Sequence, residues 1–413
     1  MAAVRIINGR DGRAIERLIA TRTNRSGTIA ARVARIVADV RARGDRAVWA
    51  YARKLDGLTG ALEIDADEIE SGARSTPANV RRALREVAKN IRKVARAQLP
   101  RASTVRVLPG LAVEQWVTPL RRVGCYVPGG RFPLPSSLLM TAIPAKVAGV
   151  GEVVAVCPRP APVVLAAALE AGVDRLFRVG GAQAIAALAY GTDTIPRVDK
   201  IVGPGNSYVA EAKALVARDC AIDFYAGPSE IVIVSNDAPA EWIAADMIAQ
   251  AEHDPEARAV FITTRVVLAR AVLRAIEARM PATGPAQKSL STRGAIIIAR
   301  SRDEAIDIAD RLPPEHLVCD DDEVLSRVRA GTAFVGPLSA QAAGDYATGS
   351  NHVLPTSGAA RFRGGLSTAD YVRVSNVQRI TRTGLRRIGP AVIALAEAEG
   401  LTAHAESIRE RMR

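Results

Sequence analysis

Short strand-like runs alternate with alanine-rich helical stretches from Val105 onwards, and this alternation limits the fold more than any other feature. Strands that alternate with helices form parallel sheets with helices on both faces. Strands between residues 122 and 223 can form one such unit, and those between 230 and 335 a second, with a Gly-Pro-Ser stretch at 227–229 between them. The expected strands are 112–116, 122–127, 152–157, 175–179, 200–202, 230–234, 259–263, 295–299 and 332–335.

The segments before and after this alternation are expected to be helical. Apolar residues recur every three or four positions within 24–98, as at Val33 and Ile36, which is typical of amphipathic helices. After Gly365 the chain is expected to become helical again, and 388–410 has the pattern of a helical segment with no sheet to join. Such an appendage often packs on a partner subunit.

Composition and charge exclude several classes of protein. The 413 residues are 48% hydrophobic and 24% charged, as in ordinary globular proteins. No run of 18 apolar residues occurs and the N-terminus turns polar at once, so we expect a cytoplasmic protein with no membrane partner. The formal net charge is +13, but aromatic residues make up only 4% and do not alternate with the arginines, so no nucleic-acid partner is expected. Four scattered cysteines without a CxxC pair are expected to be reduced and buried.

Three glycine turns each follow an expected strand, namely Gly129-Gly130, Gly180-Gly181 and Gly203-Pro204-Gly205. Two of them precede a helix directly, where backbone amides can bind a phosphate or ribose. The GxGxxG dinucleotide fingerprint is absent, because Ser207-Tyr208 follows where the third glycine is required. Tight strand-to-helix turns also need glycine for purely conformational reasons.

Histidine is the more informative residue type, because the chain has only four. Each lies beside a carboxylate, an amide or proline, and His253 shares one helix face with Gln250 three residues earlier. A single histidine of this kind is more often structural. That all four histidines lie in such surroundings favours a metal site or an acid–base site, to which Asp345 can supply a carboxylate.

At these residues the sequence resembles the histidinol dehydrogenase family, over essentially its whole length. The segments that carry the resemblance are GCYVPGG (124–130), PLPSSLLMTAIPAKVAGV (133–150), GGAQAIAALAYGT (180–192), KIVGPGNSYVAEAK (200–213), IDFYAGPSE (222–230), QAEH (250–253), PPEHL (313–317), GDYATGSNHVLPT (344–356) and EGLTAH (399–404).

The resemblance implies the site residues. It implies Glu315 and His316 as the catalytic pair, and it places His352 near the substrate without a defined role. The implied zinc ligands are Gln250, His253, Asp345 and, from the other subunit of a homodimer, His404. The implied NAD contacts are Tyr126, Gln183 and Asn206. The implied substrate contacts are Ser229, His316 and Glu399 together with the four zinc ligands.

The resemblance also implies the reaction and the fold. The reaction is the four-electron oxidation of L-histidinol to L-histidine with two NAD, the last step of histidine biosynthesis. The fold is α/β, with two incomplete Rossmann-like doubly wound units, helical terminal segments and a domain-swapped dimer. The expected divisions are 1–120 (an N-terminal helical region), 121–229 (the NAD-side domain), 230–370 (metal and catalytic residues) and 371–413 (a C-terminal helical appendage to the partner's site).

Three other functions stay open at this point. Arg131 follows the glycine pair as in related dehydrogenases of sulfonated diols, so a paralogue with another small alcohol substrate is the first. A zinc hydrolase is the second, since GxGxxG is absent. A non-enzymatic assembly protein, with C-terminal helices that serve dimerisation alone, is the third.

Overall fold

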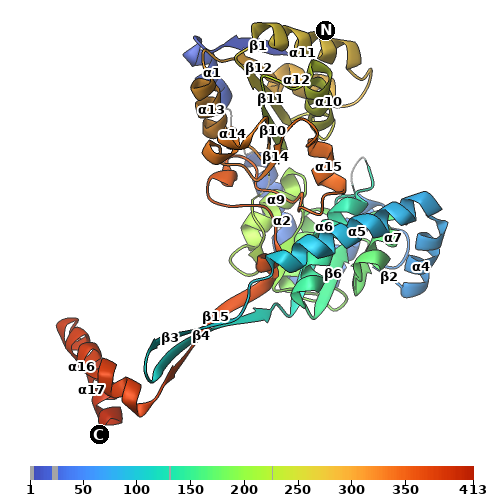
Figure 1. The fold of residues 1–413 in the computed structure, drawn as a ribbon. Helices are drawn as coiled ribbons and strands as arrows, with labels where there is room; N and C mark the ends of the chain where they lie inside the picture. The colour runs from blue at the N-terminus through green and yellow to red at the C-terminus, as the bar shows by residue number, and fades with distance from the viewer. Residues whose placement is uncertain (1–3, 21–26, 130–131, 226) are drawn as a thin grey trace.

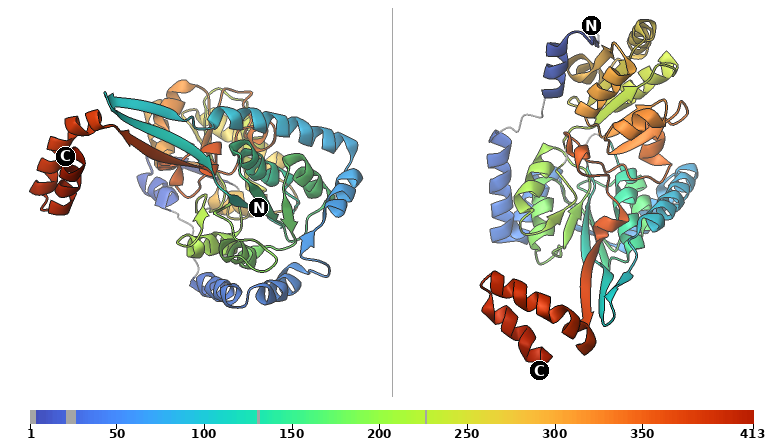
Figure 2. Two further views of the ribbon diagram at one scale, coloured as in Figure 1. Left: turned by 90° about the horizontal axis from the view of Figure 1, so that it is seen from below. Right: turned by 60° about the vertical axis from the view of Figure 1, so that its left-hand side comes forward.

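The computed structural model describes residues 4–20, 27–129, 132–225 and 227–413. The chain forms two units, each built on a six-stranded sheet, and an arm that projects away from both (Figures 1 and 2). The expected α/β class, with parallel sheets, is confirmed. In the described part of the chain, no helix is both long and apolar enough for a membrane span.

The first sheet has the strand order β2-β7-β6-β5-β8-β9, and only its edge pair β2–β7 is antiparallel. From β5 the chain first adds β6 and β7 on one side and then β8 and β9 on the other. The direction of winding therefore reverses between β5 and β8. Its strands are β2 (Glu63–Ile64), β5 (Arg122–Tyr126), β6 (Glu152–Val156), β7 (Arg175–Phe177), β8 (Lys200–Val202) and β9 (Ala221–Ile222).

Helices cover both faces of the first sheet because its central strands are apolar on both sides. One core cluster joins Cys125 of β5 to residues of α4, α5, α6 and α7, and a second joins Tyr126, the next residue, to residues of α2, α3, α8 and α9. A five-residue π-helix, η1 (Ala52–Asp56), follows α3. The helices are α2 (Gly27–Arg43), α3 (Asp45–Tyr51), α4 (Ala66–Ser75), α5 (Ala78–Gln98), α6 (Pro135–Ala148), α7 (Pro162–Ala171), α8 (Gly181–Tyr190) and α9 (Ser207–Val216).

The second sheet is parallel throughout, in the order β1-β12-β11-β10-β13-β14. Helices α1, α13 and α14 cover one face, and α10, α11 and α12 the other. Its strands are β1 (Arg5–Asn8), β10 (Glu230–Val234), β11 (Arg258–Thr263), β12 (Ala295–Ile298), β13 (His316–Cys319) and β14 (Thr332–Val335). Its helices are α1 (Gly12–Ala20), α10 (Ala240–Ala251), α11 (Val266–Arg279), α12 (Ala286–Arg293), α13 (Arg302–Arg311), α14 (Asp322–Arg327) and α15 (Gln341–Tyr346).

The arm consists of an antiparallel sheet, β15-β4-β3, and two terminal helices that pack on each other (Figure 1). Gly384 lets the start of α16 approach the β3–β4 turn closely, because a Cβ there would lie 2.1 Å from the carbonyl oxygen of Gly110. The elements are β3 (Ser103–Leu108), β4 (Leu111–Pro119), β15 (Val372–Ile380), α16 (Arg382–Ala398) and α17 (Thr402–Met412), and two short 3-10 helices, η2 (Ala359–Arg361) and η3 (Thr368–Tyr371), precede β15.

Two expectations about the terminal segments are wrong. The chain is not simply helical after Gly365, since β15 pairs along its whole length with β4 before the helices begin at Arg382. Nor is the N-terminal region only helical, since β1 pairs with β12 of the second sheet. The four cysteines are free and buried, as expected.

Candidate active site

The site lies where the carboxyl edge of the first sheet meets the amino edge of the second. Strand β9 ends at Ile222 and β10 begins at Glu230, so a seven-residue link joins the two edges. A second connection, 347–371, runs between the units: Asn351 donates to the Met140 carbonyl in α6, and the Thr356 hydroxyl accepts from the Gly227 amide. The two edges therefore supply groups to one place.

Glu315 is buried immediately before β13, where one of its oxygens is held by the chain entering β10. Oε2 accepts hydrogen bonds from the Ser229 hydroxyl at 2.5 Å and from the Glu230 backbone N–H at 2.9 Å. Burial raises the pKa of Glu315 to about 8, and these two donors only partly oppose the rise. The carboxyl group is therefore poised near neutral pH, the range in which acid–base catalysts work best.

His316 is the first residue of β13 and is also buried. Its Nδ1 lies 3.2 Å from the Glu230 carbonyl oxygen, which can only accept, so Nδ1 carries the proton. The lone pair of Nε2 faces the Gln341 amide nitrogen at 3.5 Å. Burial lowers the pKa of His316 to about 4, against the opposing effect of the Asp345 carboxylate. The ring is thus a neutral base, weaker than a histidine titrating near neutrality.

Asp345 lies one residue before the end of α15 and faces the same ring. One carboxylate oxygen is 3.8 Å from Nε2 of His316, and the other accepts from the Gln341 amide at 2.6 Å. The Asp345 carbonyl also holds Nδ1 of His352 at 2.9 Å. The structure therefore brings Asp345, His316 and His352 together.

Gln250 and His253 lie at the end of α10, which packs on α15. Gln250 is fully buried, yet neither of its amide atoms has a hydrogen-bond partner among the described residues. His253 is exposed in the turn after the helix, and its charge depresses the pKa values of His316 and His352, so it lies near both. Within the described part of the chain, no three His, Cys, Asp or Glu side chains form a group suited to a metal ion.

Glu399 and His404 are remote from this site in the same chain. Both are exposed on the arm, Glu399 at the end of α16 and His404 in α17. Figure 2 shows the two helices well separated from both units in each view. A single chain thus gathers Ser229, Gln250, His253, Glu315, His316 and Asp345, but not these two residues.

The three expected cofactor residues lie at the carboxyl edge of the first sheet. The Tyr126 hydroxyl accepts from the Gly181 amide at 3.0 Å, and the Gln183 amide donates to Asp56 at 3.0 Å. Asn206 is exposed and caps α9 by accepting from the amides of the two residues at 208 and 209. Ligands bind outside the carboxyl ends of such sheets, where the winding reverses, and that point lies between β5 and β8.

Sequence reasoning missed three polar residues that hold these groups in place. Asp56 accepts from the Gly180 amide and from Gln183, Gln341 orients Asp345, and Glu230 supplies the carbonyl for His316. Glu230 and Gln341 lie in or near motifs that the sequence analysis singled out. Asp56 ends the short π-helix after α3, and the residues around it form no motif that would mark it as functional. Arg131, the basis of the alternative substrate, lies outside the described residues.

Comparisons with known proteins agree on one family. The family model for histidinol dehydrogenase matches residues 19–412. The histidinol dehydrogenase of Methanothermobacter thermautotrophicus is 46% identical over 396 residues, covering 92% of this chain and 93% of that protein. That of Gluconobacter oxydans is 45% identical over 412 residues, covering 96% and 95%. The crystal structure of histidinol dehydrogenase from Elizabethkingia anophelis matches with a TM-score of 0.94 at 29% identity, covering 99% of this chain and 98% of that one. These names do not favour a sulfonated-diol substrate.

Proposed function

This chain belongs to the histidinol dehydrogenase family, and we propose that it oxidises L-histidinol to L-histidine through an enzyme-held aldehyde, with two NAD consumed in turn. One observation carries the proposal: a neutral, buried histidine and a carboxyl group of raised pKa are adjacent, at the edge that meets the first sheet. Two oxidations need two proton acceptors, and these groups can divide the work.

His316 takes the hydroxyl proton in the first oxidation. Its Nδ1–H bond to the Glu230 carbonyl fixes the ring and directs the basic Nε2 toward Asp345. Because the pKa of His316 is lowered, the ring stays neutral and able to accept a proton across the working pH range. The Asp345 carboxylate stabilises the imidazolium that results.

Glu315 serves the second oxidation, in which the aldehyde must add water before another hydride can leave. Both described hydrogen bonds to this carboxyl group go to Oε2, which leaves Oε1 for a water molecule. A carboxylate whose pKa is raised to about 8 is a much stronger base than an exposed glutamate. Ser229 keeps the carboxyl group in place and lies where it can also touch the substrate.

The chain's residues fit a zinc ion. An amide buried without any partner is costly, so the two unpaired atoms of Gln250 support a ligand role for it. Gln250, His253 and Asp345 offer the nitrogen and oxygen atoms that suit zinc, and His404 of a second chain would be the fourth donor. When bound, the ion supplies positive charge that orients the amino and imidazole nitrogens of the substrate.

NAD fits the carboxyl edge of the first sheet. We infer that each unit is an incomplete Rossmann-like domain, and that Tyr126, Gln183 and Asn206 contact the cofactor at the reversal point between β5 and β8. A Cβ at residue 203 would lie 2.3 Å from the Tyr126 carbonyl oxygen, so glycine keeps this edge open to a close approach. When bound, NAD supplies the hydride acceptor.

The active protein is a homodimer whose arms are exchanged. The two arm residues expected to reach a site, Glu399 and His404, are exposed and far from the site of their own chain. The arm also exposes apolar side chains that a partner would cover, with Leu395 66% exposed and Trp116 49% exposed. Glu399 of one chain then pairs with the ammonium group of the substrate bound to the other.

The stoichiometry of the reaction tests the proposed function. The purified, zinc-loaded protein should release two NADH for each histidinol consumed, with histidine as the final product by chromatography. A yield of one NADH with free aldehyde, or hydrolysis without NADH, would contradict the proposal. If the protein oxidised a sulfonated diol but not histidinol, it would instead be a paralogue with another small alcohol as its substrate.

A further inference from the structure

A salt bridge lies fully buried beneath the carboxyl edge of the first sheet. It joins Lys213 of α9 to Asp223, which directly follows β9, and the two side chains are only 2% and 0% exposed. Taking two charges out of water is expensive, and a well-packed apolar pair of similar size often stabilises a protein as well or better. Stability alone therefore does not explain this pair.

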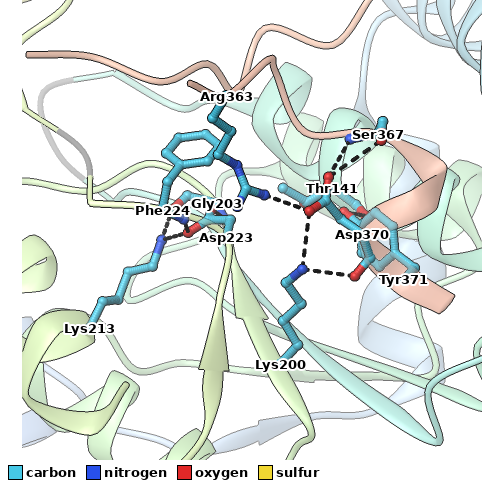
Figure 3. A network of polar contacts seen from close by, with 10 residues as sticks. All are labelled: Thr141, Lys200, Gly203, Lys213, Asp223, Phe224, Arg363, Ser367, Asp370 and Tyr371. Carbon is cyan, nitrogen blue, oxygen red and sulfur yellow. Dashed lines mark hydrogen bonds and ion pairs between the residues drawn. The ribbon is translucent and has the colours of Figure 1, made fainter. Parts of the chain in front are cut away.

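Each member of the pair forms a hydrogen bond with Gly203 (Figure 3). Asp223 Oδ2 accepts from the Gly203 amide at 2.8 Å, and Lys213 Nζ donates to the Gly203 carbonyl at 3.0 Å. Asp223 Oδ1 accepts from the Phe224 amide at 2.6 Å. The pair thus holds the peptide groups on both sides of Gly203.

Gly203 needs such a hold because its backbone is unusual. Its φ of +115° is one that residues with a side chain rarely adopt, and it is the first residue after β8. The next three residues, Pro204, Gly205 and Asn206, lead straight into α9. Asn206 fixes the far end of this turn by capping the helix.

A second group of polar residues lies beside the pair (Figure 3). The Arg363 guanidinium lies over the Phe224 ring, 5.2 Å from its centre, and forms a salt bridge with Asp370. Asp370 also accepts from Lys200, the first residue of β8, at 3.2 Å. Lys200 and Asp370 thus form a second salt bridge at the start of β8, the end away from the turn that begins at Gly203 (Figure 3).

We propose that Lys213 and Asp223 are positioning residues for the dinucleotide, which fix the turn 203–206 in the conformation that receives NAD. The inference rests on the proposed function, because it takes this edge as the NAD site. Neither residue touches the cofactor. Their effect is to hold the Gly203 peptide and the start of α9 in place before NAD arrives, so that binding does not have to order the turn.

The test compares two salt bridges that lie at opposite ends of β8, one beside the turn after it and one at its first residue. The double variant Lys213→Met/Asp223→Asn removes the buried pair without leaving an unpaired charge, and Lys200→Met removes the control pair. NAD affinity is measured by isothermal titration calorimetry, and melting temperature by circular dichroism. We expect the double variant to bind NAD about tenfold to a hundredfold more weakly, with a matching rise in KM for NAD and a smaller change in kcat.

The control decides between a positioning role and a structural one. Lys200→Met is expected to lower the melting temperature while leaving NAD affinity within the error of the wild type. Equal NAD affinity in the wild type and the double variant would overturn the proposal. So would equal losses of affinity in the double variant and in Lys200→Met. If the wild-type protein itself does not bind NAD, the proposed function fails, and that outcome is distinct from a folded variant that binds normally. Should the double variant not fold, the variant Lys213→Gln/Asp223→Asn, which leaves no unpaired charge and keeps polar groups beside Gly203, is measured in the same way.

Discussion

His316 is expected to carry the largest share of catalysis by a single side chain. Replacing it with alanine removes the base but leaves the Glu230 carbonyl next to a small cavity, so kcat for NADH formation should fall by about 10² to 10⁴. The measurement is steady-state NADH absorbance at saturating histidinol and NAD. His352→Ala is the natural comparison, because its ring contacts the same aspartate. An equal loss in both variants would show that His316 has no special role as a base.

The raised pKa of Glu315 predicts how the rate of the second oxidation depends on pH. Its carboxyl must be ionised to activate water, and burial raises its pKa to about 8, so the second oxidation should slow as pH falls through that value. Glu315→Gln keeps an acceptor for Ser229 but has no base. It should accumulate aldehyde, release about half the NADH of the wild type, and lose the acidic limb centred near pH 8. A variant that retained both the limb and the full NADH yield would contradict this assignment.

Gln250 allows the zinc role to be separated from stability. A buried amide without partners costs about 1–3 kcal/mol, so Gln250→Leu should raise the free energy of unfolding of the metal-free protein. The same variant should bind less zinc per chain, measured by atomic emission after dialysis. A variant that is less stable without metal, or one that keeps a full equivalent of zinc, would argue against a ligand role.

At the scale of the element, α10 carries a carboxyl group that opposes folding. Burial raises the pKa of Asp246 to about 6, above its value in the unfolded chain, so the stability associated with its protonated form is lost as pH rises through about 6. Because the side chain is partly exposed, Asp246→Asn should stabilise the protein above that pH by only about 1 kcal/mol. Urea unfolding at two pH values measures this, and a gain of equal size at low pH would be contrary to the argument.

The strands that could be predicted from sequence are those that neighbouring helices bury on both faces, because burial on both faces gives a continuous run of apolar residues. Strands such as β6 and β10 are apolar on both faces, since helices cover both, and their runs stand out. Strand β13 has four residues after a proline pair, too few for a period to appear. In the arm, β15 has mostly exposed positions with a few half-buried ones at irregular spacing, so no strand period stands out. Its partner β4 is more than 250 residues distant in sequence.

In the site, too, features that depend on nearby residues could be predicted from sequence, whereas features that depend on distant residues could not. Motif residues such as Glu315 and His316 could be proposed from sequence because their sequence neighbours are distinctive. Their pKa values could not be foreseen, because these depend on burial by segments far away in the chain. Asp56 holds Gln183 across 127 positions, and no local pattern encodes such a pairing.

At the scale of the whole molecule, an exchanged arm predicts complementation between two inactive chains. His316→Ala lacks the base but has an intact arm, whereas His404→Ala has an intact site but a defective arm. Each homodimer should be nearly inactive. After co-refolding, a mixed dimer should contain one complete site and one doubly defective site, so activity should return to about a quarter of wild type for random pairing, measured as NADH per chain. No recovery in mixed dimers, verified by differential tagging, would exclude a site shared in this way.

The position of β1 has a consequence for the order in which the protein is made. Arg5 pairs with Ala295, so β1 is synthesised ~290 residues before β12, its one neighbour in the sheet among the described residues. At ~5–20 residues per second, that interval lasts roughly 15–60 s. During this time Ile6 and Ile7 are available to other nascent chains, while the strands and helices of the first sheet, which are encoded in between, are synthesised. The speed of synthesis, and chaperones that shield β1, should therefore influence the yield of the second unit more than that of the first.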